Sequence, residues 1–377
     1  MAGKKRKMVL LFFIIVLCMQ IGCQKQTAQI QKNTVSEIKL GVAVYKKEDT
    51  FISMLISNLE EEIKKAQQQK NVKITMNTMD AKGSQTVQND QIDKLIEQGC
   101  DILCVNLVDR TVASAVIDKA KAADIPVIFF NREPVSEDLE RWDNVYYVGA
   151  EASESGYLQG RIVVEAYEKN PYAIDKNGDG KIQYVVLEGE QGHQDALLRT
   201  EYAVKTITDA GIQMDKLAGD TANWDRSQAA TKMNQWLQMY KNQIELVLSN
   251  NDDMAIGAID AYESAAKPLP AIVGVDGTAL AIEALQEGKL LGTVENDAQK
   301  QAELIFSLSY DLAIDPRPRE NTDMSKQKYF FTKYTIIYPE DILKKSDKQG
   351  DLDTNLSYHG KVTESFYLCR ASVLLTQ

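Results

Sequence analysis

The sequence predicts an α/β protein with two lobes in tandem, each built on a parallel sheet. Short apolar runs alternate with longer amphipathic runs over residues 38–130, and the same alternation begins again near residue 146. Repeated βα units of this kind are typical of parallel sheets that helices cover on both faces. About 350 residues follow an N-terminal export-like segment, and that length is enough for two domains of ordinary size.

The first series alternates strand-like and helix-like segments. Apolar residues recur at helical spacing between the strand-like runs, and Ser84 is the predicted N-cap of one helix that ends at Gly99. A further helix is predicted over residues 113–123. The predicted strands cover residues 38–45, 72–76, 102–106 and 125–130.

The second series repeats the pattern. It begins near 146–149, with strands predicted at 182–187, 246–248, 271–275 and 291–294 and helices around 153–168, 195–210, 225–240, 252–265 and 277–287. The helical run 298–312 follows the second lobe's strands, so we expect it to return to the first lobe through a hinge with several crossovers. The expected lobes are 37–149 with 297–333, and 150–296 with 334–345; no role is assigned to the tail 346–377.

The N-terminus has the pattern of a lipoprotein signal. Four basic residues precede an apolar run over residues 8–19, which is too short to span a bilayer as a helix. Gly22-Cys23 then resembles a bacterial lipobox, although Gln20 stands where Leu is usual. We therefore expect 1–22 to be removed, Cys23 to be lipidated, and 23–36 to form a tether; a plain signal peptide, or a membrane helix with an unmodified Cys, is the alternative.

The charge and the cysteine content argue against a nucleic-acid-binding protein, a disulfide-stabilised domain and a cysteine metal site. Without the four basic residues of the signal, 39 basic residues face 54 acidic ones, a net charge of −15 that disfavours nucleic acid as a partner. Cys100, Cys104 and Cys369 are an odd set without metal-type spacing. Cys100 and Cys104 are therefore interpreted as small core residues, outside any disulfide framework.

Polar side chains follow nearly every predicted strand. In open α/β sheets ligands bind beyond the carboxyl ends of the strands, and Asp, Asn and Arg offer the donors and acceptors that a ligand covered in hydroxyls needs. Any single Asn or Asp there is better explained as a helix cap or turn residue. The whole set, with Arg and His included, points to a binding site: Asp49, Asn131, Arg132, His193, Asp195, Arg199, Asn250, Asn251, Asp252, Asp276, Asn296 and Asp297.

Two aromatic residues stand near these positions. Trp224 lies between two predicted elements, and Phe51 follows a charged loop. A pyranose has two apolar C–H faces, so one aromatic side chain from each lobe could cover both faces. Each residue alone could equally be an ordinary core aromatic.

One loop fits the front half of a calcium-binding loop. Asp175, Asn177 and Asp179 supply side-chain oxygens, the carbonyl of Lys181 follows, and Gln183 adds another side-chain oxygen. Position 12 is Val186 instead of Glu, so the loop is not an EF-hand and its closing carboxylate must come from elsewhere. A solvated Asn/Gly turn is the weaker alternative.

Together these motifs make the chain resemble the D-galactose/D-glucose-binding proteins of bacterial ABC importers. The resemblance runs from about residue 38 to about 340 and departs from the family at Arg132, where Lys is usual, and at Asn223, where Met is usual. The matching segments are 44–51, 88–93, 106–109, 129–134, 146–149, 175–183, 192–199, 220–225, 250–252, 274–276 and 292–297.

The resemblance implies two Rossmann-like lobes of the type I periplasmic-binding-protein fold and a function without catalysis. The expected ligand is D-galactose or D-glucose, delivered by a monomer, lipid-anchored outside the cytoplasm, to the membrane subunits of an ABC importer; a chemotaxis or sensor role is also possible. A structural Ca²⁺ is implied, with Glu245 closing the set Asp175, Asn177, Asp179, Lys181 and Gln183. The implied sugar contacts are Asp49, Phe51, Asn131, His193, Asp195, Arg199, Trp224, Asn251, Asp276 and Asn296.

Two other functions use similar residues. A LacI-like ligand-binding domain that feeds a signalling partner would share the fold, but a repressor would need a basic helix-turn-helix where this chain has an export-like segment. A glycosidase would need a pair of carboxylates such as Asp49 and Asp195 with one raised pKa. The sequence shows no hydrolase motif, and His193 and His359 are its only histidines.

Overall fold

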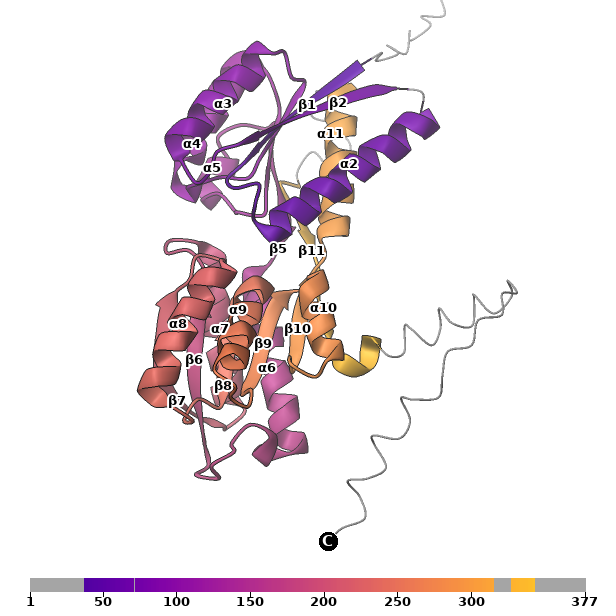
Figure 1. Ribbon diagram of the computed structural model, residues 1–377. Helices are drawn as coiled ribbons and strands as arrows, with labels where there is room; N and C mark the ends of the chain where they lie inside the picture. The colour runs from indigo at the N-terminus through magenta and orange to yellow at the C-terminus, as the bar shows by residue number, and fades with distance from the viewer. Residues whose placement is uncertain (1–36, 71, 315–326, 343–377) are drawn as a thin grey trace, which may run out of the picture. The chain divides into compact units, whose positions relative to one another are not determined.

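The computed structural model describes residues 37–70, 72–314 and 327–342, so the expectations for the signal, for Cys23 and for the tail lie outside the described residues. The described chain forms two six-stranded sheets (Figure 1). The first has the order β11-β5-β4-β3-β1-β2, with every neighbouring pair parallel. The two-lobed α/β fold predicted from the sequence is confirmed.

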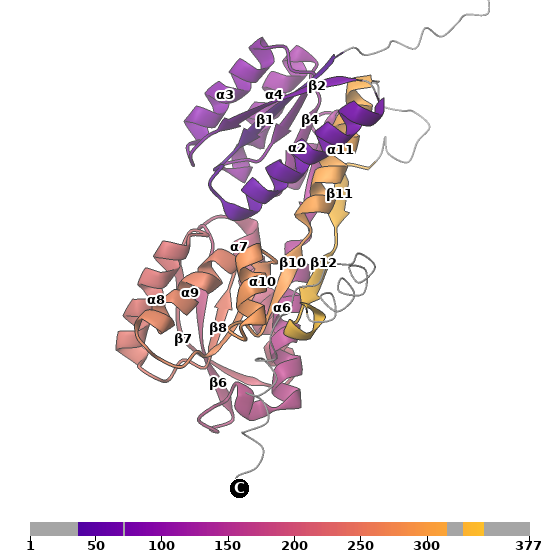
Figure 2. The ribbon, with the colours of Figure 1, turned by 45° about the vertical axis from the view of Figure 1, so that its right-hand side comes forward.

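The strands of the first sheet are β1 (Glu37–Val44), β2 (Lys73–Asp80), β3 (Ile102–Val105), β4 (Val127–Phe130), β5 (Val145–Ala150) and β11 (Tyr329–Thr332). Helices α3 (Gln85–Glu97) and α4 (Ala113–Ala123) pack on one face, through Ile92, Leu95, Val116 and Ile117. On the other face α2 (Thr50–Lys70) and α11 (Ala298–Ile314) lie side by side (Figures 1 and 2). Ser84 caps α3 as predicted, since its side chain accepts from the Val87 N–H.

The second sheet has the order β12-β10-β9-β8-β6-β7, and only its edge strand β12 runs antiparallel to its neighbour. Its strands are β6 (Lys181–Glu188), β7 (Gln213–Thr221), β8 (Leu246–Ser249), β9 (Ala271–Asp276), β10 (Gly292–Asn296) and β12 (Tyr334–Ile337). Strand β7 was not predicted. Most of its residues are partly or fully exposed, so it lacks the apolar run that marks a buried strand.

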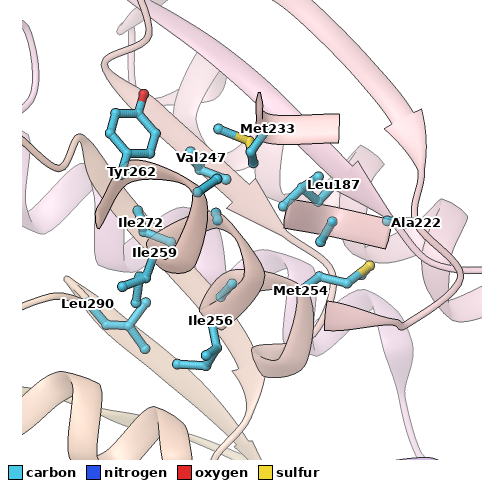
Figure 3. Close-up of a cluster of buried hydrophobic side chains, with 14 of the residues drawn as sticks. Leu187, Ala222, Met233, Val247, Met254, Ile256, Ile259, Tyr262, Ile272 and Leu290 are labelled. Atoms are coloured by element: carbon cyan, nitrogen blue, oxygen red, sulfur yellow. The ribbon is translucent and has the colours of Figure 1, made fainter. Parts of the chain in front are cut away.

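Alternation along these strands divides the second lobe's core between two faces. Val185, Leu187, Val247 and Ile272 pack under α8 (Arg226–Tyr240), α9 (Asp252–Ser264) and α10 (Ala279–Gln286), the cluster shown in Figure 3. Residues of the opposite parity, among them Tyr184 and Val186, pack under α6 (Ala152–Lys169) and α7 (Gln194–Asp209). Both faces of the second sheet are therefore buried, so a functional site is expected at the ends of its strands.

The chain passes between the sheets three times. It crosses after β5, returns after β10 into α11, and crosses again between β11 and β12. Short elements complete the described chain: η1 (Arg110–Val112), α5 (Ser136–Leu139) and η2 (Pro171–Ala173). Within the described ranges no helix has the length and apolar character needed to cross a membrane. Cys100 and Cys104 are buried free thiols, as predicted.

Candidate functional site

Nine of the ten implied sugar contacts line one pocket, together with Tyr45 and Arg132. Each follows the carboxyl end of a strand or begins the next helix, where a parallel sheet gathers its functional side chains. From the first lobe come Asp49 and Phe51 after β1, and Asn131 after β4. From the second lobe come His193, Asp195 and Arg199 after β6, Trp224 after β7, Asn251 after β8 and Asp276 at the end of β9.

Asn296 is the one implied contact that does not line this pocket. It ends β10, is buried, and its Oδ1 accepts a hydrogen bond from Gln301 Nε2 at 2.6 Å. Conversely, Tyr45 and Arg132 line the pocket, although the sequence placed only Arg132 in the strand-end set and neither residue among the implied sugar contacts. The signal for both was in the sequence, because each stands beside a predicted contact at a strand end.

Arg199 organises the second lobe's half of the pocket. Its Nη1 donates to the carbonyl of Asn250 at 2.7 Å and lies 3.7 Å from Asp276 Oδ1, while its Nη2 lies 3.5 Å from Asp195 Oδ2. The side chain is buried, and its Nε is without a hydrogen-bond partner. A buried N–H that lacks a partner is costly, so this donor is available to a polar ligand.

Burial disfavours the charged form of the two carboxyl groups beside Arg199, Asp195 and Asp276. Burial raises the pKa of Asp195 and raises that of Asp276 well above its ordinary value, although the Arg199 guanidinium opposes both shifts. Buried carboxyl groups of this kind gain from hydrogen-bond partners that replace lost water. The pair therefore suits a ligand rich in O–H groups.

His193 is neutral in this environment, because burial and then the charges of Arg132 and Arg199 lower its pKa well below the ordinary value. Its Nδ1 accepts from the backbone N–H of Asp195 at 3.1 Å, which caps α7. The proton of the neutral ring is thereby assigned to Nε2, which can donate to a ligand. The ring also stands edge-on to Trp224, with centroids 5.1 Å apart.

Several pocket residues adopt backbone conformations that side chains rarely take. Asn131, Trp224 and Asp276 have φ values of 60°, 61° and 117°. Conformations of this kind persist only when the surroundings impose them. Asp252 does so for Asp276: its buried carboxylate accepts from the Thr278 N–H at 2.8 Å and from the Thr293 hydroxyl at 2.6 Å, which fixes the turn after β9.

The pocket is tight as it stands. The free space among its lining residues is about 30 Å³, room for about two water molecules and not for a hexose. Side chains of the two lobes also bond directly: Thr50 with Asp253, and Arg132 with Glu190. Entry of a sugar therefore requires the lobes to separate.

A second cavity, of about 340 Å³, lies next to this pocket, and Arg132 and His193 line both. Its other lining residues are mostly polar and come from the segments after β3 and β4 and from the loop after β6. They include Asp109, Arg110, Glu133, Glu190 and Gln194.

The predicted calcium loop lies at the other end of β6. Asp175 accepts from the N–H groups of Gly178 and Gly180, and Glu245 accepts from those of Lys176, Asn177 and Gln183. Both carboxylates are buried. Glu245 thus closes over the loop from a segment more than 60 residues away.

The remaining side chains of the loop converge on one another. Asn177 Nδ2 lies 2.7 Å from Gln183 Oε1, and Gln183 Nε2 lies 2.9 Å from Asp179 Oδ2. Either amide can turn its oxygen inward, since amide orientation follows the hydrogen-bond network. In the described part of the chain no three His, Cys, Asp or Glu side chains are grouped to hold a metal by themselves. The set instead mixes carboxylates, amides and a carbonyl, as calcium prefers.

Comparison with known proteins identifies the family of this chain. Residues 40–315 match the family model of the periplasmic binding protein domain. The chain belongs to this family. A D-galactose/methyl-galactoside binding periplasmic protein of Haemophilus influenzae is 40% identical over 285 residues, 75% of this chain and 84% of that protein. The ribose import binding protein of Bacillus subtilis is 26% identical over 314 residues, 82% and 93% of the two chains.

Solved structures agree with this assignment. A solute binding protein of Bacillus halodurans with bound myo-inositol superposes with a TM-score of 0.69 at 26% identity, covering 84% of this chain and 99% of that one. This periplasmic binding protein is accordingly a sugar-capturing component for ABC import and not an enzyme, and its relatives are extracytoplasmic. The glycosidase alternative is thereby excluded.

The position of the Trp224 ring depends on the absence of a side chain at Gly189. A Cβ built on Gly189 would fall far inside van der Waals contact with Cη2, Cζ2 and Cε2 of the Trp224 ring. We expect Gly189→Ala to displace the indole and weaken sugar binding by about 1–3 kcal/mol, because the aromatic wall moves. Isothermal titration measures the loss.

Gly219→Ala is the matched control, because the Cβ there comes close only to the flexible end of Lys216 and meets Glu188 Oε1 at an ordinary 3.5 Å, so its affinity should equal that of the wild type. An unchanged affinity for Gly189→Ala would show that the indole position is unimportant for binding.

Proposed function

We propose that this periplasmic binding protein captures D-galactose or D-glucose and delivers it to an ABC importer. The observation that carries the proposal is the pocket itself. Phe51 and Trp224 supply apolar surface for the C–H faces of a pyranose, while carboxylates, amides and Arg199 supply partners for its hydroxyls. The 40% identity to a galactose-binding relative favours a hexose over a pentose.

Binding follows from separation and closure of the lobes. Each lobe presents a preformed half-site, and the half-sites meet around the sugar when the lobes close. The ligand then supplies hydrogen-bond partners for Arg199 Nε, for the His193 Nε2–H and for the buried carboxyl groups. Delivery to the importer requires the reverse step, and a sensor function would use the same closed form.

The wild-type protein should bind D-galactose or D-glucose with a Kd near the micromolar range, about −8 kcal/mol. Trp224→Ala should weaken that binding by about 1–3 kcal/mol, because one apolar wall is lost. Trp224 also belongs to the second lobe's core cluster, so the variant should unfold at a lower temperature as well. Calorimetry on the folded protein separates the two effects.

Trp236→Ala serves as the control, because Trp236 belongs to the same core cluster but not to the pocket. It should lower the melting temperature and keep hexose affinity. Binding of a pentose with no heat from either hexose would refute the substrate and leave the family unaffected.

We further propose that residues 175–183 with Glu245 bind a structural Ca²⁺. The side-chain ligands would be Asp175, Asn177, Asp179, Gln183 and Glu245, with the carbonyl of Lys181. Bound there, the ion would tie the loop before β6 to the start of β8. The support is the buried carboxylates and the converging amides.

Calcium that binds only the folded form should raise the melting temperature, and a chelator should lower it. Glu245→Gln should remove most of that shift and leave hexose affinity in calcium-free buffer nearly intact, because the loop and the pocket lie at opposite ends of β6. Asp209→Asn, an exposed carboxylate elsewhere in the same lobe, should retain the shift. A wild-type melting temperature that ignores the chelator would leave the loop as a simple turn.

We propose, finally, that Cys23 carries a lipid anchor. The support is the lipobox-like sequence after a short apolar run. Cys23→Ser should move the protein from the membrane fraction to the soluble fraction, since acylation supplies the attachment. Cys18→Ser, inside the apolar run, should stay with the membrane. A membrane-bound Cys23→Ser variant would point to an uncleaved signal helix.

A further inference from the structure

Arg132 is a buried residue of the first lobe that contacts both lobes. It follows β4 of the first lobe and is 5% exposed. Its Nη2 donates to Glu190 Oε2 of the second lobe at 2.6 Å, and its Nη1 donates to the carbonyl of Val108 at 2.8 Å. One rigid guanidinium therefore joins two strand ends of its own lobe to a carboxylate of the other lobe.

The same guanidinium stacks on Tyr45. Its Cζ lies 3.6 Å from the centre of the tyrosine ring, a cation–π contact that burial strengthens. The Tyr45 hydroxyl in turn donates to Asp49 Oδ2 at 2.5 Å, while Asp49 Oδ1 accepts from the Ile52 N–H. A continuous series of contacts thus runs from Glu190 through Arg132 and Tyr45 to a pocket-lining carboxylate.

The position of Arg132 also matters for access. Arg132 lines both the tight pocket and the larger cavity beside it, whereas Glu190 lines only the larger cavity. The Arg132–Glu190 ion pair accordingly spans the lobes on the side where the pocket adjoins that cavity. Separation of the lobes breaks this ion pair and removes one restraint on the Arg132 guanidinium.

We propose that Arg132, Glu190 and Tyr45 are positioning residues that couple lobe closure to the orientation of Asp49. In the closed form Glu190 holds the guanidinium flat on Tyr45, and Tyr45 holds the Asp49 carboxylate toward the sugar. When the lobes part, the guanidinium loses its contact with Glu190, and the orientation that Tyr45 imposes on the Asp49 carboxylate is less strictly fixed. This proposal rests on the proposed capture of a sugar in the pocket.

The test is stopped-flow binding of D-galactose and D-glucose, beginning with the wild type. Glu190→Gln keeps the shape of the side chain and removes its charge. We expect its dissociation rate constant to rise about tenfold and its association rate constant to change less than twofold, because the pair forms only on closure. The melting temperature of the sugar-free variant confirms that it is folded.

Two further readouts separate positioning from general packing. Raising the salt concentration should speed dissociation from the wild type and affect Glu190→Gln much less, since the pair is partly exposed and screened. Tyr45→Phe removes the hydroxyl that holds Asp49 and should weaken binding. The double variant should lose less than the two single effects combined, as expected for residues that act in series.

Asp260→Asn is the matched control. Arg226 and Asp260 form an equally short, bidentate ion pair, but within the second lobe alone. Its loss should leave both rate constants unchanged. A wild-type dissociation rate for Glu190→Gln, or full additivity in the double variant, would overturn the coupling. Absence of hexose binding by the wild type would instead overturn the proposed substrate.

Discussion

The second lobe's half of the pocket depends on one buried cation. Arg199 contacts residues that arrive from α7, from the end of β8, from the end of β9 and from Tyr334 at the start of β12. A buried guanidinium must be paired, and its planar fork fixes the position of each partner. The converging strand ends are thus held by charge as well as by the sheet. Without this cation, the buried Asp195 and Asp276 carboxyl groups would lose the charge that opposes the rise of their pKa values.

The sheets also explain why polar side chains gather in the pocket. Apolar residues fill both faces of each sheet, so the strand ends are the place where polar side chains accumulate. The pocket takes its apolar surface from Phe51 and Trp224 and its polar surface from residues near the helix starts. His193 and Asn251, for example, cap α7 and α9 while they line the pocket. Capping and ligand binding are therefore functions of the same side chains in this fold.

Most strands and most pocket residues were predictable from the sequence. Buried parallel strands give continuous apolar runs, so β1, β3, β4, β6, β8 and β9 were found, whereas the exposed edge strand β7 was not. The pocket residues were found because strand ends converge. Asn296 shares that position in the sequence, but its side chain turns to Gln301. The stacking of Arg132 on Tyr45 joins segments about 90 residues apart, and no local pattern encodes that contact.

Because the chain passes between the sheets three times, both sheets are completed only late in synthesis. The first sheet acquires its edge strand β11 only from residues 329–332, after β6 to β10 of the second sheet, and β12 follows directly. A ribosome must therefore release almost the whole described chain before either sheet can be completed. Late completion of both sheets is compatible with transport of the chain in an unfolded state, before either lobe has formed.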